Sequence, residues 1–167
     1  VPGKALELVR RLESRRAAIR ESLEPWRTGP PKRVLFLLSI EEDGSPGWSP
    51  GRNTWISDLV VEAHGENLAD QMGTSWGQVS YEALVAMNPE VLLIRRSLNP
   101  MEQARMESQV ARLQEHPVWG GLTAVRQERV HWIPNEPVSI PGPRVMDGLE
   151  AIARALWLEP GHEPGVP

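Results

Sequence analysis

The stretch "SWGQVSYEALVAMNPEVLLI" (residues 75–94) decides the fold, because it places a helix directly before a buried strand. Ser80 is a favoured N-cap residue, and the Asn-Pro pair at 88–89 closes the helix that it begins. The run after this pair is short, continuous and apolar, which is typical of a strand covered on both faces of a sheet. Three residues around the helix entrance have no evident role in the core: Trp76, Tyr81, which is expected to point outward, and Glu82.

The alternation of helices and strands continues along the chain. Short apolar runs at residues 33–39 and 130–134 predict two further buried strands, with a weaker strand near 67–69. Apolar residues at steps of three and four predict helices at 54–64, at 99–117 and from Pro143 onward. Strands that alternate with helices predict an α/β, three-layer lobe with a mostly parallel sheet flanked by helices.

A long amphipathic helix is predicted at residues 3–24, before the first strand. Its apolar side chains recur at steps of three and four: Leu6, Val9, Leu12, Ile19 and Leu23. The segment "TGPP" (28–31) follows and cannot continue the helix. One lobe is expected to cover only part of this apolar stripe, so the rest should contact another surface.

The composition excludes several classes of protein. With 167 residues, 40% of them hydrophobic and 24% charged, the chain suits one soluble domain, and no apolar run is long enough for a membrane-spanning helix. The absence of cysteine excludes disulfides and thiolate metal sites. Residues 1–33 hold nine Lys/Arg against four Asp/Glu, but these charges alternate on a helix, so nucleic-acid binding is not expected. The chain starts with neither Met nor a signal sequence, and we expect a processed or excised piece.

Catalytic motifs are scarce in this sequence. It contains no nucleophile elbow, no P-loop and no paired-histidine zinc motif. The four histidines are far apart along the chain: His64, His116, His131 and His162. No catalytic residue, no metal ligand and no cofactor is therefore expected.

Two tryptophans differ from the others in their surroundings. Trp55 and Trp157 fall at core positions of predicted helices, whereas Trp48 and Trp76 lie among glycines and prolines in loops after predicted strands. Ligands bind at the carboxyl ends of strands in such sheets, and an indole on a rigid loop offers a flat apolar wall. The alternative is that each of the two indoles packs onto the core of its own lobe as a lid. Similarly, Glu82 in the first turn of its helix is favoured by the helix dipole, which is a purely structural explanation.

Four segments occur in an order that resembles a known family. They are "PGRNTWISDLVVEAHGENLAD", "SWGQVSYEALVAMNPEVLLI", "LTAVRQERVHWIP" and "PGPRVMDGLEAIARALW". The chain is similar over residues 1–158 to the substrate-binding proteins of ABC importers for cobalamin, iron–siderophore and haem complexes, and the cobalamin-binding members are the most similar. These proteins have two α/β lobes joined by a rigid helix, with the ligand between the lobes. The resemblance implies a connecting helix at 1–28, a C-terminal lobe at 29–158 and a flexible tail at 159–167.

The resemblance also implies roles for single residues. Glu82 matches the glutamate that docks this lobe onto arginines of the membrane permease. Ile140 stands where the cobalamin-binding protein has a ligand-contacting arginine, so this chain departs from the family pattern there. Four residues match or neighbour ligand contacts: Trp48, Trp76, Glu136 and Arg144.

The partners follow from the same resemblance. The expected ones are a tetrapyrrole or iron-chelate ligand, an ABC permease and an N-terminal lobe that this chain lacks, and a fragment without that lobe is expected to form a homodimer through its helix. Such a protein is periplasmic or extracytoplasmic and reaches the membrane only through the permease. Two alternatives remain open from the residues: a stand-alone α/β interaction domain and a metal-dependent enzyme.

Overall fold

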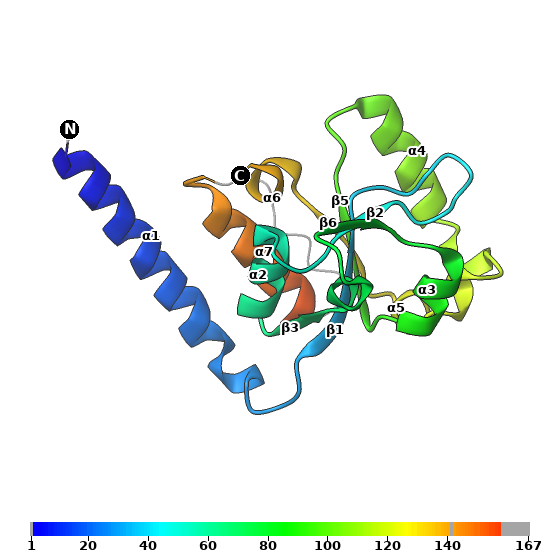
Figure 1. Ribbon diagram of the computed structural model, residues 1–167, viewed down its shortest axis with the longest axis horizontal. Coiled ribbons are helices and arrows are strands. Elements are labelled where there is room, and N and C mark those ends of the chain that lie inside the picture. The colour runs from blue at the N-terminus through cyan, green and yellow to red at the C-terminus, as the bar shows by residue number, and fades with distance from the viewer. Residues whose placement is uncertain (1, 141, 158–167) are drawn as a thin grey trace.

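The computed structural model describes residues 2–140 and 142–157, with seven α-helices and six strands in that part of the chain (Figure 1). The helices are α1 (Pro2–Leu23), α2 (Trp55–Glu62), α3 (Tyr81–Met87), α4 (Pro100–Val110), α5 (Thr123–Arg126), α6 (Asn135–Ser139) and α7 (Val145–Trp157). The strands are β1 (Lys32–Leu37), β2 (Trp48–Pro50), β3 (Gly65–Asn67), β4 (Trp76–Gln78), β5 (Val91–Arg95) and β6 (Val130–Ile133). Short 3₁₀ turns are η1 (Glu24–Trp26), η2 (Leu68–Met72), η3 (Leu113–Glu115) and η4 (Trp119–Gly121). The expected tail at 159–167 lies outside the described residues.

The main sheet has the strand order β3-β1-β5-β6, and all its neighbouring strands are parallel. The central strands are continuous apolar runs, and the side chains of residues 34–37 and 91–94 are fully buried. Burial on both faces is what parallel sheets require, because the crossover helices cover each side. The carboxyl ends of the four strands therefore lie along one edge of the sheet.

Alternate residues of the central strands enter two separate cores. Phe36 and Leu93 pack with α2, α7 and the end of α1, whereas Leu35 and Ile94 pack with α3, α5 and the 3₁₀ turns. This alternation is the period of two that a strand imposes. The predicted three-layer α/β lobe with a parallel sheet is confirmed.

The long helix α1 is covered only near its C-terminal end. Ile19 and Leu23 are buried in the core, whereas Leu6 and Val9 are about half exposed. Figure 1 shows the N-terminal turns of α1 standing apart from the rest of the lobe. Ion pairs connect the C-terminal half of α1 to the lobe. Arg15 pairs with Asp147 and Glu150 of α7, and both Arg16 and Arg20 pair with Glu62 of α2.

The sequence-based boundaries differ from the structure in four places. The two loops in which Trp48 and Trp76 were expected each contain a strand, β2 and β4, and these strands pair with one another. The helix expected at 99–117 ends at Val110, and its predicted last turns are replaced by η3. There, the ring nitrogen Nδ1 of His116 accepts hydrogen bonds from the backbone N–H groups of Val118 and Trp119 and turns the chain. Residues 135–139, for which no helix was expected, form α6.

Candidate ligand-binding site

The two loop tryptophans lie on a two-stranded antiparallel ribbon formed by β2 and β4. Trp48 pairs with Gln78, and Pro50 pairs with Trp76. Paired residues and residues two apart share one face of a ribbon, so both indoles project from the same face. They are 48% and 40% exposed, respectively. The ribbon thus presents two flat apolar side chains together.

The opposite face of the ribbon holds it against the main sheet. Ser49 is fully buried there, and its hydroxyl donates a hydrogen bond of 2.6 Å to the carbonyl oxygen of Phe36 in β1. The backbone N–H of Leu38 donates to the carbonyl of Trp48 at 2.8 Å. At Gly77 the packing is close, because an added Cβ would lie 2.1 Å from the terminal carbon of Met72, which would have to move. The ribbon is therefore fixed at the carboxyl edge, where β1 ends.

The ribbon contacts a second segment at this edge through Trp55, the first residue of α2. The rings of Trp76 and Trp55 meet edge to face, with 6.0 Å between centroids and an interplanar angle of 65°. The indole N–H of Trp55 donates to the carbonyl of Val138 in α6 at 2.7 Å. Trp55, which the sequence assigned to the core, is only half-buried and links the ribbon to α6.

The two charged residues expected near the ligand also lie on or beside α6. Glu136, in the first turn of α6, forms an ion pair with Arg144, which also approaches Asp147 at 3.4 Å. The side chains of Glu136 and Arg144 are 60% and 64% exposed, so each partner remains open to solvent. Ile140, between them in sequence, is also exposed.

The sequence analysis missed Arg95, which ends β5 at the carboxyl edge. Its Nη1 donates to the hydroxyl of Ser139 in α6 at 3.3 Å, and its buried Nε has no hydrogen-bond partner. Burial lowers the pKa of the Arg95 guanidinium, and the charge of Glu102 opposes this shift. A signal was present in the sequence, because "LLIRR" ends a buried strand with an arginine at the edge where ligands bind.

Glu82 is exposed at the start of α3, as its expected docking role requires. The hydroxyl of Ser80 caps this helix by accepting a hydrogen bond from the N–H of Ala83 at 3.1 Å. Glu82 forms no ion pair with any residue that the structure describes.

The expectation that Tyr81 points outward is wrong. Its ring is half-buried against the core and stacks on His116, with 5.8 Å between ring centroids. Burial raises the pKa of the Tyr81 phenol.

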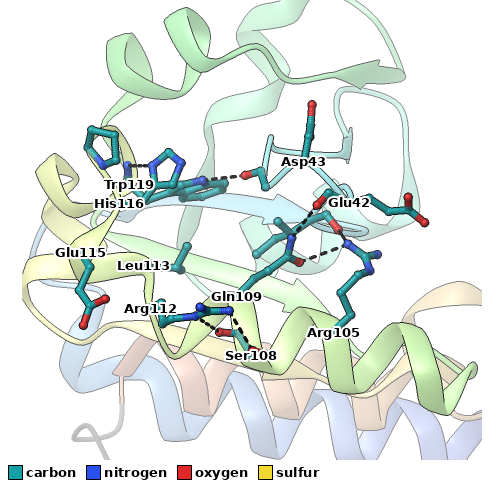
Figure 2. Close-up of a pocket in the computed structure, with 13 residues that line it drawn as sticks. Glu42, Asp43, Arg105, Ser108, Gln109, Arg112, Leu113, Glu115, His116 and Trp119 are labelled. Carbon is teal, nitrogen blue, oxygen red and sulfur yellow. Dashed lines mark hydrogen bonds between the residues drawn. The ribbon is translucent and has the colours of Figure 1, made fainter.

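A pocket of about 600 Å³ lies beyond this stack, between the loop after β1, helix α4 and the turns that follow it (Figure 2). The indole N–H of Trp119 donates to the carbonyl of Gly44 at 3.0 Å, and Gln109 donates to the carbonyl of Glu41 at 2.8 Å. Figure 2 shows charged side chains of both signs around this space: Glu42, Asp43, Arg105, Arg112 and Glu115. Neither Trp48 nor Trp76 lines the pocket, so it is separate from the aromatic ribbon.

Metal-binding chemistry finds no support in the described part of the chain. No group of three or more His, Asp or Glu side chains gathers there in a way that could hold a metal ion. Half-burial and the nearby charge of Arg129 lower the pKa of His131, which is packed in β6. His162 lies outside the described residues. Within the same described residues, no helix combines the length and the apolar character needed to cross a membrane.

In open parallel α/β sheets, ligands bind outside the carboxyl ends of the strands, and the aromatic ribbon of this chain lies at that edge. Among known protein families, the one described as periplasmic binding protein matches residues 2–137 of this sequence. The chain belongs to this family. The relatives and structural neighbours are binding proteins, so the expectation that the chain is not an enzyme is confirmed.

Two curated relatives are ABC-type or iron-related binding proteins. The chain is 24% identical over 155 residues to an uncharacterized ABC transporter substrate-binding lipoprotein, YvrC, of Bacillus subtilis, covering 92% of this chain and 45% of the relative. It is 30% identical over 130 residues to the Fe(3+) dicitrate-binding periplasmic protein FecB of Escherichia coli, covering 77% and 39%. The expected resemblance to substrate-binding proteins of ABC importers is confirmed.

Solved structures share the fold. The periplasmic heme-binding protein RhuT from Roseiflexus sp. RS-1 matches with a TM-score of 0.74 and 26% identity, covering 94% of this chain and 57% of that one. An ABC-type Fe3+-hydroxamate transport protein from Saccharomonospora viridis matches with a TM-score of 0.74 and 23% identity, covering 92% and 49%. The chain thus spans about half the length of the proteins it matches.

Proposed function

We propose that this chain is the ligand-binding lobe of an ABC importer's substrate-binding component, and that it captures a cobalamin-like, haem or iron-chelate ligand. The observation that carries the proposal is the pair of exposed indoles, Trp48 and Trp76, on one face of the β2–β4 ribbon. The iron-related and haem-related names of the relatives support the ligand class.

The geometry suits a flat or broad apolar ligand. Indoles on a ribbon pinned by Ser49 lose little conformational entropy when they contact a ligand. A single wall covers about half of such a ligand, whereas well-formed sites bury about 70–90% of it. A second lobe would supply the other wall, and the exposed Leu6 and Val9 of α1 are suited to contact it.

Delivery to a permease is assigned to Glu82. An exposed carboxylate without a partner among the described residues is free to meet an arginine of another protein, and such a charge acts mainly on encounter rate and orientation. The protein would work outside the cytoplasmic membrane, in line with the lipoprotein and periplasmic descriptions of its relatives.

The test is a fluorescence titration of the full-length protein with haemin, ferric dicitrate and cobalamin. We expect at least one of them to quench tryptophan fluorescence saturably, and Trp48→Ala and Trp76→Ala each to weaken its binding by roughly 10-fold or more, since each indole contributes on the order of 1–2 kcal/mol of contact. Trp26→Ala is the matched control, because Trp26 is similarly exposed but lies on η1. Equal affinities in all variants would contradict the proposed site.

A further inference from the structure

His116 holds its turn through a hydrogen-bond acceptor that a proton can remove. Its ring nitrogen Nδ1 accepts from the backbone N–H groups of Val118 at 3.1 Å and of Trp119 at 3.3 Å. Acceptors in this position are usually the side-chain oxygens of Ser, Thr, Asn or Asp. An imidazole accepts only through an unprotonated nitrogen, and its charge changes between about pH 5 and 8. The geometry therefore requires a neutral ring with its proton on Nε2.

The turn that His116 begins joins three segments of the lobe. The backbone N–H of Gly120 donates to the carbonyl of His116 at 2.9 Å. Trp119 is fully buried, and its indole N–H donates to the carbonyl of Gly44, in the loop after β1, at 3.0 Å. The ring of His116 stacks on Tyr81, the first residue of α3, with an interplanar angle of 19°. The turn, the loop and the start of α3 therefore share contacts around one ring.

Glu82 lies directly beside these contacts. The loop after β1 approaches Tyr81 closely, because an added Cβ on Gly44 would lie 3.9 Å from the Tyr81 hydroxyl. Glu82 follows Tyr81 in α3 and is exposed. The face that carries the proposed docking residue thus adjoins the turn that His116 holds.

Charged groups from several segments line the same pocket as His116 (Figure 2). They are Glu42 and Asp43 of the loop after β1, Arg105 of α4, and Arg112 and Glu115 of the segment that precedes His116. Tyr81 is the titratable group that contacts the ring from α3. Hydrogen bonds from the hydroxyl and backbone N–H of Ser45 lower the pKa of Asp43, so this carboxylate stays negative in mild acid. A protonated ring would therefore meet both carboxylates and arginines on the pocket side.

We infer that His116 is a pH-sensitive switch for the face of the lobe that carries Glu82. At neutral pH the uncharged ring holds the turn, the loop after β1 and Tyr81 together. In acid the added proton occupies Nδ1, at which two backbone N–H groups point, so both hydrogen bonds are lost and the turn is released. The stabilisation is thus present at neutral pH and lost as the pH falls. The consequence for docking rests on the proposed function: the permease should bind the acid form less tightly.

Three variants isolate this titration. His116→Asn keeps a side-chain acceptor at every pH, since Asn accepts hydrogen bonds from such turns and does not titrate. His116→Ala has no acceptor at any pH. His64→Asn is the matched control, because His64 is a half-buried histidine directly before β3 and its φ of 61° suits Asn. This control removes one titrating imidazole and leaves the turn at 116–121 untouched.

The first experiment measures hydrogen exchange of the Val118 and Trp119 backbone N–H groups in the full-length protein, at about pH 7.5 and about pH 5. After correction for the intrinsic exchange rate, protection in the wild type and in His64→Asn should fall roughly fivefold in acid, as for a lost cap. Protection in His116→Asn should be equal at both pH values, and in His116→Ala it should be low at both. The ¹⁵N chemical shifts of His116 should show a proton on Nε2 alone at the higher pH and on both nitrogens at the lower.

The second experiment measures binding of the full-length protein to its permease in lipid nanodiscs at the same two pH values. The affinity of the wild type should fall in acid by roughly threefold or more relative to that of His116→Asn. The comparison with His116→Asn removes the contribution of all other titrating groups, including those of the permease.

The contrary results separate the switch from the proposed function. Wild-type protection that stays constant in acid, or that falls equally in His116→Asn, overturns the switch. An acid loss of permease binding that is equal in the wild type and in His116→Asn overturns its link to docking and leaves the role of Glu82 standing. A protein that binds its permease at neither pH overturns the proposed delivery and the consequence for docking with it, while the exchange measurement still decides the switch.

Discussion

Two groups of tryptophans lie at opposite edges of the main sheet and are used differently. At the amino edge, Trp157 stacks on Trp26, with 6.1 Å between centroids and 14° between planes, and on His64 at 5.4 Å. Its indole N–H donates to the carbonyl of Ala63 at 2.8 Å, and the ammonium group of Lys32 lies 5.4 Å from its ring centre. At the carboxyl edge, Trp76 meets a single aromatic neighbour, and Trp48 stacks on none of the described residues.

Exposure alone does not separate the two groups. Trp26 is 43% exposed, between Trp48 at 48% and Trp76 at 40%. The difference lies in the aromatic contacts. Trp26 and Trp157 stack on each other, whereas Trp76 has one aromatic neighbour and Trp48 has none among the described residues. A scattered exposed tryptophan needs no functional explanation, but two on one face of a rigid ribbon favour a binding surface.

The largest expected effect is on the amino-edge group. Trp157→Ala should lower the free energy of unfolding by about 3 kcal/mol, because it removes a large half-buried ring together with its hydrogen bond and stacking partners. Denaturant unfolding measures this change, and ligand affinity should stay at the wild-type value. Trp157→Phe keeps an aromatic ring but loses the indole N–H donor. Its free energy of unfolding should lie between those of the wild type and Trp157→Ala. A Trp157→Ala variant that keeps its stability but loses ligand would reverse the roles that we assign to the two edges.

Much of this fold could be predicted from the sequence, because its signals are local. The apolar run at 90–96, the Ser80 cap and the periodicity of α1 each reflect interactions within a few residues, and the structure reproduces all three. Strands β2 and β4 were missed because each is only three residues long and includes a proline or a glycine, and because only their pairing with each other makes them strands.

The candidate site was harder to predict, for a related reason. Trp48 and Trp76 could be singled out by their surroundings, but their common face depends on the ribbon register. The prediction that Tyr81 points outward was wrong because its stacking partner, His116, lies on a turn that is distant in sequence. Arg95 drew no attention because the lack of a partner for its Nε is a property of the packed lobe and not of any motif.

A smaller effect on the free energy of unfolding is expected for a charged residue, Glu62. Partial burial acts to raise the pKa of Glu62, but hydrogen bonds and charge from Arg16 and Arg20 outweigh it and hold the pKa below its ordinary value of 4.5. A carboxylate with a lowered pKa stabilises the fold above its unfolded pKa, and this contribution is lost as the pH falls through the folded pKa.

Glu62→Gln should therefore reduce the free energy of unfolding by about 1 kcal/mol at pH 7, since the arginines are partly exposed and screened. The difference from the wild type should shrink when the pH is lowered below about 4. Denaturant unfolding at a series of pH values measures both. Glu66→Gln is the matched control, because Glu66 is exposed nearby on β3 and makes no ion pair with the described residues. A pH-independent difference would show that Glu62 acts through packing and not through its charge.

The smallest effect on stability is expected at Glu82, where a carboxylate has been left without a partner in the described lobe. Its interaction with the dipole of α3 is worth about 0.3–1 kcal/mol, so Glu82→Ala should change the free energy of unfolding by less than about 1 kcal/mol. Ligand affinity should not change, because Glu82 lies on neither the ribbon nor α6. Uptake of the ligand by cells that carry the full-length variant should nevertheless fall, and Glu82→Asp, which keeps the charge, should restore part of it. Glu107→Ala, which removes an exposed carboxylate from α4, controls for a general loss of surface charge. Normal uptake with Glu82→Ala would exclude the docking role. Glu82 would then have only the structural role of a negative charge in the first turn of α3, where the helix dipole favours it.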